Sequence, residues 1–327
     1  MVRRWCLGVM VGLAGCAAVG KGPAATAPEA TYPRLAAVDL PRDCGKTIAL
    51  SPDAGLLAAS CSSGEIDAWR LGTAAPVLAL RGHESGINGL AFSADGRFLG
   101  SASCDRTVRI WEVSTGRSVQ TLEGAGCAVS SVAFSPDGGL LASGDRDRNI
   151  RLWDLRIGAV RSILAGHQGC VDSLAFSPDG ALLASGGYDC GVRVWDVASG
   201  QCQEVCEGHQ DSVTCLAFSR DSTLLAAGSA DRSVYVWRVA DGSRAAVLRG
   251  HSGRIVSVSF SPDGKVLASG SVDHTVRLWE IASGRELGRA PGNLLAHFTP
   301  EGRLIGAGAS GDRLHLSDLT AAVPTVP

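Results

Sequence analysis

The chain has 327 residues, of which 45% are hydrophobic, 5% are aromatic and 42 are glycine, and its formal net charge is −2. This composition favours an all-β fold, because glycine-rich turns separate short strands. No basic stripe is present that could neutralise phosphates, so we expect no nucleic-acid partner. The sequence contains no run of about 18 apolar residues, so we predict no membrane-spanning helix.

Residues 1–15 have the parts of an export signal in the usual order. Arg3 and Arg4 provide positive charge, residues 5–13 are apolar, and the sequence LAGC ends at Cys16. The apolar run has the length of a signal-peptide core and is too short to span a membrane. This order resembles the signal peptide and lipobox of bacterial lipoproteins, which implies cleavage before Cys16 and lipidation of that cysteine. The alternative is an unprocessed apolar N-terminus in which the four-residue motif occurs by chance.

The residues that follow are expected to connect a lipid anchor to a folded domain. Residues 16–33 are small, contain proline and lack apolar periodicity, so we predict a lipidated flexible tether. Each buried methylene of an acyl chain contributes about 0.8 kcal/mol to membrane binding, so two or three chains would hold the protein firmly. Residue 17 is alanine rather than aspartate, which by resemblance to lipoproteins implies the outer membrane.

A repeat of 42 residues governs the rest of the chain. Six tryptophans share this spacing, and a Gly-His pair, a Phe-Ser-x-Asp sequence and an aspartate six residues before the tryptophan recur in the same register. Within one period, short apolar runs alternate with turns rich in Gly, Asp and Pro, which predicts four strands. The tryptophans are Trp69, Trp111, Trp153, Trp195, Trp237 and Trp279.

This unit resembles the WD40 repeat, which has about 40 to 45 residues and four strands, with Gly-His near its start and Trp-Asp near its end. The resemblance extends from residue 34 to about residue 319 and implies an all-β, seven-bladed WD40 β-propeller. We therefore predict a signal peptide at 1–15, a tether at 16–33, a propeller at 34–320 and a C-terminal tail at 321–327.

The last blade is predicted from a degenerate repeat at residues 294–319, in which Phe298 matches the repeat phenylalanine. This segment provides only three strands, because the sequence after Leu319 is rich in proline. Residues 34–53 align without gaps to residues 244–263, which places residues 35–39 at the position of an outer strand. We expect this N-terminal strand to pair into the last blade and close the ring, which leaves only short sheet edges exposed.

Serine, histidine, aspartate and tryptophan recur together at fixed spacing. Ser-His-Asp sets also form hydrolase triads, but a catalytic site is needed once, whereas this set returns in three blades. By resemblance to WD40 repeats, the aspartate orients the histidine, whose other nitrogen meets the serine, and the tryptophan nitrogen completes a structural network. Losing one member costs roughly 1–3 kcal/mol. The complete sets are His83, Ser101, Asp105 and Trp111; His167, Ser185, Asp189 and Trp195; and His251, Ser269, Asp273 and Trp279.

The other four blades lack members of this network. Ala125 replaces the histidine in the blade of Trp153, and Ala227 replaces the serine in the blade of Trp237. The first and last blades differ at several positions, so we predict that they are the loosest, with lower hydrogen-exchange protection than the blade of Trp279. Their substitutions are Pro41, Ala59 and Ser63 in the first blade and Asn293, Ala307 and Gly311 in the last.

Two further patterns predict no chemistry. The sequence G-x-G-x-x-G at residues 306–311 would need a following helix to bind a dinucleotide, but it lies in a predicted β-hairpin. None of the eleven cysteines forms a C-x-x-C pair, so we predict no zinc site, and most of the cysteines are expected to be small core residues. Nine cysteines would remain after processing and lipidation, and this odd number weakens the interpretation as an exported protein. We predict no catalytic residue, metal or cofactor.

Function is expected where the repeats differ, because their shared residues are structural. By resemblance, WD40 propellers bind partners around the central channel, where the residue before each network aspartate and the start of each inner strand lie. Residue types that anchor interfaces occur at these positions, although each could be an ordinary loop residue. The mixed polarity favours a peptide or protein partner. The candidate partner-binding residues are Arg146, Tyr188, Asp172, Arg254, Asn88 and Cys104.

Three functions remain open at this point. The first is a non-enzymatic protein-interaction scaffold, anchored by lipid on the outer side of a bacterial membrane. The second is a soluble cytoplasmic WD40 adaptor or regulatory subunit whose N-terminus is not processed. The third is an enzyme, but the sequence has no unrepeated cluster of nucleophile, base and metal ligands.

Overall fold

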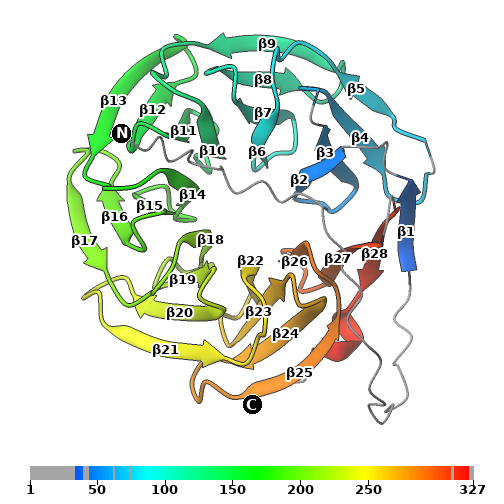
Figure 1. The fold of residues 1–327 in the computed structure, drawn as a ribbon, viewed down its shortest axis with the longest axis vertical. Helices are drawn as coiled ribbons and strands as arrows, with labels where there is room; N and C mark the ends of the chain where they lie inside the picture. The colour runs from blue at the N-terminus through cyan, green and yellow to red at the C-terminus, as the bar shows by residue number, and fades with distance from the viewer. Residues whose placement is uncertain (1–33, 40–43, 62, 74, 311–312, 324–327) are drawn as a thin grey trace, which may run out of the picture.

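The computed structural model describes residues 34–39, 44–61, 63–73, 75–310 and 313–323. Over these residues, 28 strands form seven four-stranded antiparallel sheets that surround a central channel as the blades of a propeller (Figure 1). A short 3₁₀ helix, η1 (Thr320–Ala322), follows the last strand. The predicted signal peptide, Cys16 and the tether lie outside the described residues, as do Pro41, Gly311 and the last four residues of the predicted tail.

Blades 1 to 6 each contain four consecutive strands, ordered from the channel outward. Blade 1 contains β2 (Cys44–Leu50), β3 (Leu56–Cys61), β4 (Ile66–Arg70) and β5 (Leu78–Leu80). Blade 2 contains β6 (Ile87–Phe92), β7 (Phe98–Ser103), β8 (Val108–Glu112) and β9 (Arg117–Leu122). Blade 3 contains β10 (Val129–Phe134), β11 (Leu140–Asp145), β12 (Asn149–Asp154) and β13 (Ala159–Ala165).

The next three blades repeat this arrangement. Blade 4 contains β14 (Val171–Phe176), β15 (Leu182–Gly187), β16 (Val192–Asp196) and β17 (Cys202–Cys206). Blade 5 contains β18 (Val213–Phe218), β19 (Leu224–Ser229), β20 (Ser233–Arg238) and β21 (Arg244–Arg249). Blade 6 contains β22 (Ile255–Phe260), β23 (Val266–Ser271), β24 (Thr275–Glu280) and β25 (Glu286–Pro291).

Blade 7 joins the two ends of the propeller, as predicted. It contains β26 (Leu295–Phe298), β27 (Leu304–Ser310) and β28 (Arg313–Asp318), and β1 (Arg34–Asp39) pairs antiparallel with β28 as the outer strand (Figure 1). The register places Ala37 opposite His315 and Val38 opposite Leu314. The prediction of seven blades and a closing N-terminal strand is therefore confirmed. The G-x-G-x-x-G sequence that begins in β27 is followed by the strand β28 and not by the helix that a dinucleotide site would need.

The core lies between neighbouring blades rather than inside any one sheet. The side chains of Leu80 in blade 1 and Leu99 and Trp111 in blade 2 belong to one buried cluster, and Trp111 is 1% exposed. Similar clusters occupy the other gaps around the ring. The second strand of each blade has neighbouring sheets on both faces, so its residues are mostly small or apolar instead of alternating between polar and apolar. Burial of this apolar surface contributes about 25 cal/mol per Å² to stability.

The recurring Phe-Ser-x-Asp sequence forms the turn after the inner strand in blades 2 to 6, and blade 1 has Leu50 in place of the phenylalanine. In blade 2, the Ser93 hydroxyl donates to Asp95 Oδ1 at 2.6 Å and accepts from the backbone N–H of Phe98 at 2.9 Å. Asp95 also accepts from the backbone N–H of Arg97 at 3.0 Å. An aspartate that bonds to the backbone two residues later stabilises a tight turn, which explains the fixed sequence.

The prediction that most cysteines are core residues is wrong. Cys206 is buried, but Cys202 is exposed and the others outside disulfides are half-buried, namely Cys104, Cys127, Cys170, Cys190 and Cys215. Most of these lie in turns or at the start of inner strands, where the repeats vary, and not in the layers between blades. Cys61 is buried and forms a disulfide bond, and the backbone register of β2 and β3 places Cys44 opposite it.

The described residues contain no helix long and apolar enough to cross a membrane. They also contain no group of three or more His, Cys, Asp and Glu side chains arranged to hold a metal ion.

Candidate partner-binding face

In blade 2, the four predicted network residues form a continuous chain of hydrogen bonds. The carboxylate of Asp105 can only accept, so His83 Nδ1 carries the proton and donates to Asp105 Oδ2 at 2.7 Å. His83 Nε2 then accepts from the hydroxyl of Ser101 at 2.7 Å, and the same hydroxyl oxygen accepts from Trp111 Nε1 at 2.8 Å. The serine therefore uses both its donor and its acceptor inside the blade.

Blades 4 and 6 contain the same chain of hydrogen bonds. His167 and His251 lie 2.9 and 2.8 Å from their aspartates and 2.7 and 2.8 Å from their serines. Each tryptophan donates to its serine at 2.8 Å. Burial raises the pKa of Asp105, but hydrogen bonds from Thr107 and His83 outweigh it and lower that pKa to about 2. Burial lowers the pKa of His83 and His251, which keeps both rings neutral.

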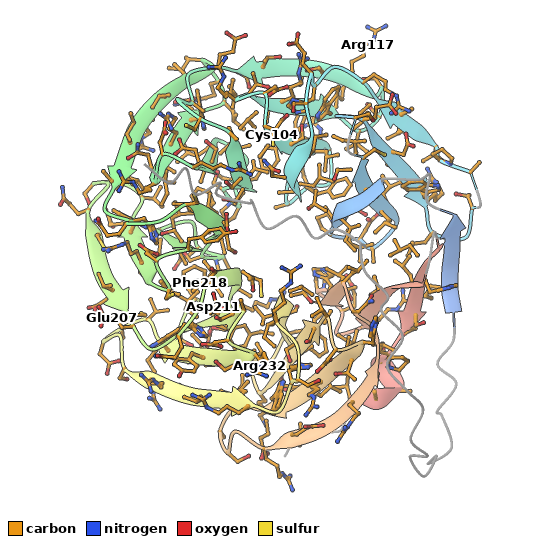
Figure 2. The ribbon with its side chains drawn as sticks, in the orientation of Figure 1. Cys104, Arg117, Glu207, Asp211, Phe218 and Arg232 are labelled. Atoms are coloured by element: carbon orange, nitrogen blue, oxygen red, sulfur yellow. The ribbon has the colours of Figure 1, made fainter. Side chains whose placement is uncertain are left out.

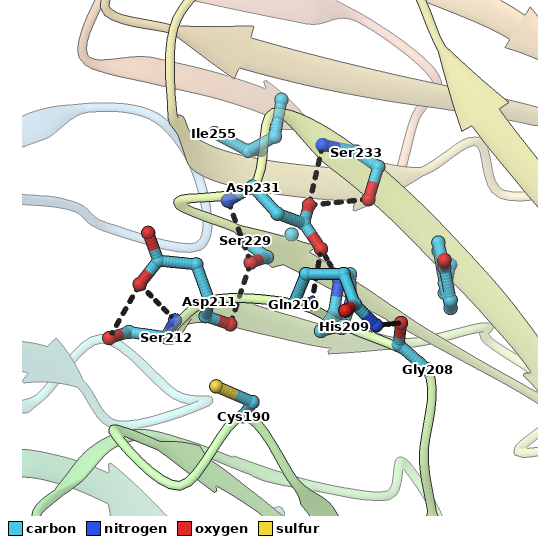
Figure 3. Close-up of polar contacts among 12 residues, drawn as sticks. Cys190, Gly208, His209, Gln210, Asp211, Ser212, Ser229, Asp231, Ser233 and Ile255 are labelled. Atoms are coloured by element: carbon cyan, nitrogen blue, oxygen red, sulfur yellow. Dashed lines mark hydrogen bonds and ion pairs between the residues drawn. The ribbon is translucent and has the colours of Figure 1, made fainter.

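Blade 5 contains only part of the network, because Ala227 has no hydroxyl. Figure 3 shows the remaining contacts of His209 and Asp231. His209 Nδ1 lies 2.9 Å from Asp231 Oδ2, and the backbone N–H of Gln210 donates to the same oxygen at 3.0 Å. His209 Nε2 is buried and has no hydrogen-bond partner. The ring stacks on Tyr235 with centroids 4.4 Å apart, which fills the space without satisfying the nitrogen.

Blade 3 replaces the histidine interaction with a buried ion pair that sequence reasoning missed. Ala125 stands at the histidine position, and Arg151 Nη1 instead pairs with Asp145 Oδ2 inside the blade. The two side chains are 9% and 1% exposed. Trp153 keeps its hydrogen bond to Ser143 at 2.8 Å. The sequence feature that could have indicated this ion pair is the charged residue at position 145, because the equivalent residue in blades 2, 5 and 6 is serine.

Blades 1 and 7 lack the network, as their sequences indicated. Trp69 Nε1 is buried in blade 1 and has no hydrogen-bond partner, since Ala59 stands where a serine would accept it. In blade 7, the Asn293 side chain instead contacts His274 Nδ1 of blade 6 at 2.8 Å. Greater looseness of these two blades stays a prediction.

The antiparallel topology brings the variable residues to one end of the ring. The turn between the second and third strands of each blade lies at the end where the inner strand begins. We call this end the channel face. Side chains around the channel are shown in Figure 2, where Cys104 lies beside the opening and Arg117 on the outer rim.

A cavity of about 750 Å³ opens at the channel face. Blades 2, 3 and 4 supply most of its walls, and the other four blades supply one to three residues each. All six candidate partner-binding residues line it: Asn88 and Cys104 of blade 2, Arg146 of blade 3, Asp172 and Tyr188 of blade 4, and Arg254 of blade 6. The structure thus brings together residues from positions 88 to 254 of the sequence.

Several polar side chains in the walls of this cavity are held by hydrogen bonds to backbone carbonyl groups. Asn88 Nδ2 donates to the carbonyl oxygen of Val129 at 2.8 Å and lies 3.2 Å from Cys104 Sγ, so this amide is already held in place. Thr214 is likewise held by the carbonyl oxygen of Ile255 at 2.6 Å. Tyr188 lines the same cavity and is 36% exposed.

Arg148 also lines the cavity, although sequence reasoning did not select it. It follows Arg146 by two residues in the β11–β12 turn and has a left-handed φ of 70°. Arginine also occupies the equivalent positions 106 and 232, and only Arg148 among these lines the cavity. No sequence signal distinguishes the three.

Three guanidinium groups and one carboxylate determine the charge of the cavity walls. Arg146 and Arg148 are exposed and Arg254 is half-buried, and none of them forms an ion pair within the described part of the chain. Asp172 is half-buried, and burial raises its pKa to about 6 despite the opposing charge of Arg146. Such a site can bind a polar segment, because charged and polar groups of both signs line it.

Comparison with protein families agrees with this architecture. The family model for the WD domain, G-beta repeat, matches residues 74–112, 116–154, 158–196, 200–238 and 242–280, which is more than half of the chain. Each matched unit spans the outer strand of one blade and three strands of the next, so the repeats interlock around the ring. The chain matches no curated protein closely enough to provide a relative. The chain therefore belongs to the WD40-repeat family.

Proposed function

We propose that this protein is a non-enzymatic interaction scaffold that binds a peptide or protein segment in the cavity of the channel face. A WD40 propeller fits a protein-interaction scaffold. The proposal rests on one observation: six residues chosen for their interface chemistry, from four blades, line a single cavity. Its volume and its mixture of apolar walls with a few polar groups are typical of ligand-binding sites.

The repeated Ser-His-Asp sets support a structural role better than a catalytic one. Ser101, Ser185 and Ser269 are each 0% exposed, and each hydroxyl is hydrogen-bonded to a histidine and a tryptophan. A nucleophile must reach its substrate, and these hydroxyls are enclosed between sheets.

A pull-down with variants of the channel face tests the binding role. Arg146→Ala and Tyr188→Ala each introduce the residue found at the equivalent position of blade 5, Ala230, so the fold should accept both changes. We expect both to reduce the recovery of a specific partner, because anchoring aromatic and arginine residues dominate interfaces. Arg117→Ala on the rim should leave recovery unchanged. Equal recovery of every partner by the parent and both face variants would overturn the proposal.

We further propose that the scaffold is a bacterial lipoprotein, attached to the outer membrane through Cys16. The order of positive, apolar and LAGC segments in residues 1–16 supports this location. The disulfide bond of Cys61 adds support, because structural disulfides persist mainly in oxidising compartments outside the cytoplasm. The competing proposal is a cytoplasmic adaptor with an unprocessed N-terminus.

Labelling with palmitate separates these two locations. In a bacterial host, the parent chain should incorporate the label and Cys16→Ala should not. Retention of the full-length, unlabelled chain in the cytoplasm would contradict the lipoprotein proposal and favour the adaptor, while leaving the binding role intact.

A further inference from the structure

The cavity of the channel face has more positive than negative charge. Arg146, Arg148 and Arg254 line it, whereas Asp172 is its single carboxylate among the described residues. Burial of an arginine next to its own counterion would neutralise it, but none of these three has such an ion pair. Their charge is therefore available to a molecule that enters the cavity.

The three guanidinium groups lie on two sides of the channel. Arg146 and Arg148 belong to the turn between β11 and β12, and Arg254 directly precedes β22, which Figure 1 shows across the channel from β11. An extended segment can contact both sides of the channel at once. The walls between them are largely apolar, and they include Leu90 and Leu174. Charge interactions gain strength beside such walls, because less water screens them.

We infer that the occupant of this cavity is an acidic peptide segment, whose carboxylates pair with Arg146 and Arg148 of blade 3 and with Arg254 of blade 6. This inference rests on the proposed binding function and names the chemistry of the partner. The guanidinium fork pairs with carboxylates in a bidentate geometry. A nucleic acid is a poorer fit, because the basic residues are separated by apolar walls and form no continuous stripe.

The repeats provide variants that other blades already accommodate. Arg146→Ala introduces the residue of blade 5, and Arg148→Gly introduces Gly64 of blade 1, which has a φ of 88°. Arg254→Ser corresponds to Ser212 of blade 5, and Asp172→Asn to Asn88 of blade 2. These changes alter the charge of the cavity while they keep residues that the fold tolerates at the same positions.

Fluorescence anisotropy with the full chain tests the inference. The probe is a short fluorescein-labelled peptide in which glutamate and glycine alternate, and glutamine and lysine versions serve as references. We expect the glutamate peptide to bind at least about tenfold more tightly than either reference, and added salt to weaken it. Arg146→Ala, Arg148→Gly and Arg254→Ser should each weaken binding, and Asp172→Asn should strengthen it because it removes a repulsive charge.

Several results would overturn the inference. These are equal affinity for the glutamate and glutamine peptides, preference for the lysine peptide, an equal loss in the rim control Arg117→Ala, or displacement by oligothymidylate at lower concentration than by unlabelled glutamate peptide. Absence of binding by all three peptides would also overturn it. Channel-face variants could reduce partner recovery while the glutamate peptide binds no more tightly than the references. In that case the inference of an acidic partner is wrong and the proposed binding function stands.

Discussion

Blades 5 and 6 have the same backbone and differ at one hydroxyl group in their networks. Leu216 pairs with Ala227 in blade 5 as Val258 pairs with Ser269 in blade 6, and the histidines lie 2.9 and 2.8 Å from their aspartates. In blade 6 the serine satisfies both histidine and tryptophan, whereas in blade 5 His209 Nε2 has no partner. The 42-residue repeat therefore forms the four-stranded sheet even where the network is incomplete. We expect the network to change the stability of the blade and not its fold.

Blade 3 shows a third solution to the same problem. Without a histidine, it buries the ion pair of Arg151 and Asp145 at the end of the sheet where the other network lies. Buried ion pairs are costly to break, because the remaining charge has no partner.

The largest effect is expected in blade 3. Arg151→Leu should lower the free energy of unfolding by about 3–5 kcal/mol, because it leaves the buried carboxylate of Asp145 without its counterion. Urea denaturation would measure it. Arg156→Leu is the matched control, since it breaks the exposed pair with Asp154 and should change stability little. Equal losses in the two variants would show that the buried pair has no special role.

A smaller effect is expected in blade 6. Ser269→Ala should cost about 2 kcal/mol, because it removes the partner of both His251 Nε2 and Trp279 Nε1, and His209 Nε2 of blade 5 already lacks such a partner. The same urea titration would measure it, with Ser252→Ala on the exposed surface as the control. A loss of stability no larger than that of the control would contradict the idea that the serine hydroxyl makes blade 6 more stable than blade 5.

The reverse change in blade 5 should stabilise the protein. Ala227→Ser provides the missing hydroxyl for His209 Nε2 and should raise the free energy of unfolding by about 1 kcal/mol. Ala240→Ser, in an exposed turn of the same blade, should have no effect. A destabilised Ala227→Ser variant would mean that Tyr235, stacked on His209, already fills the space that the hydroxyl needs.

The smallest effect is the pH dependence of the histidines. Because burial lowers the pKa of His209 and His251 below 6.5, the unfolded chain binds more protons, and stability should fall as the pH drops below 6.5. Thermal unfolding between pH 7.5 and 5.5 would show it. The measurement should be made in the Asp172→Asn variant. The raised pKa of Asp172 makes its own contribution to stability increase as the pH falls through this range, which opposes the effect of the histidines. His251→Gln should reduce the slope, and an increase in stability on acidification would contradict the prediction.

Much of the fold could be predicted from local patterns. The 42-residue spacing of the tryptophans, the turn sequences and the gapless alignment of residues 34–53 with residues 244–263 together indicate seven sheets and the closing strand. These sequence patterns could be recognised because they reflect contacts within one 42-residue repeat, or contacts that every repeat makes with the next. The network residues were identified for the same reason, since each hydrogen bond joins residues of one blade.

Resemblance to WD40 repeats placed six variable residues around the channel, and the tertiary structure alone decided which further residues share their cavity. Arg148 lines the channel while arginines at equivalent positions 106 and 232 do not, and the pairing of Arg151 with Asp145 was not expected. The cavity depends on how different blades direct their side chains across the channel, and residues 88 and 254 meet only after the ring closes. A repeat determines the architecture because its interactions are local, whereas the binding site arises from differences between blades that only the closed ring brings together.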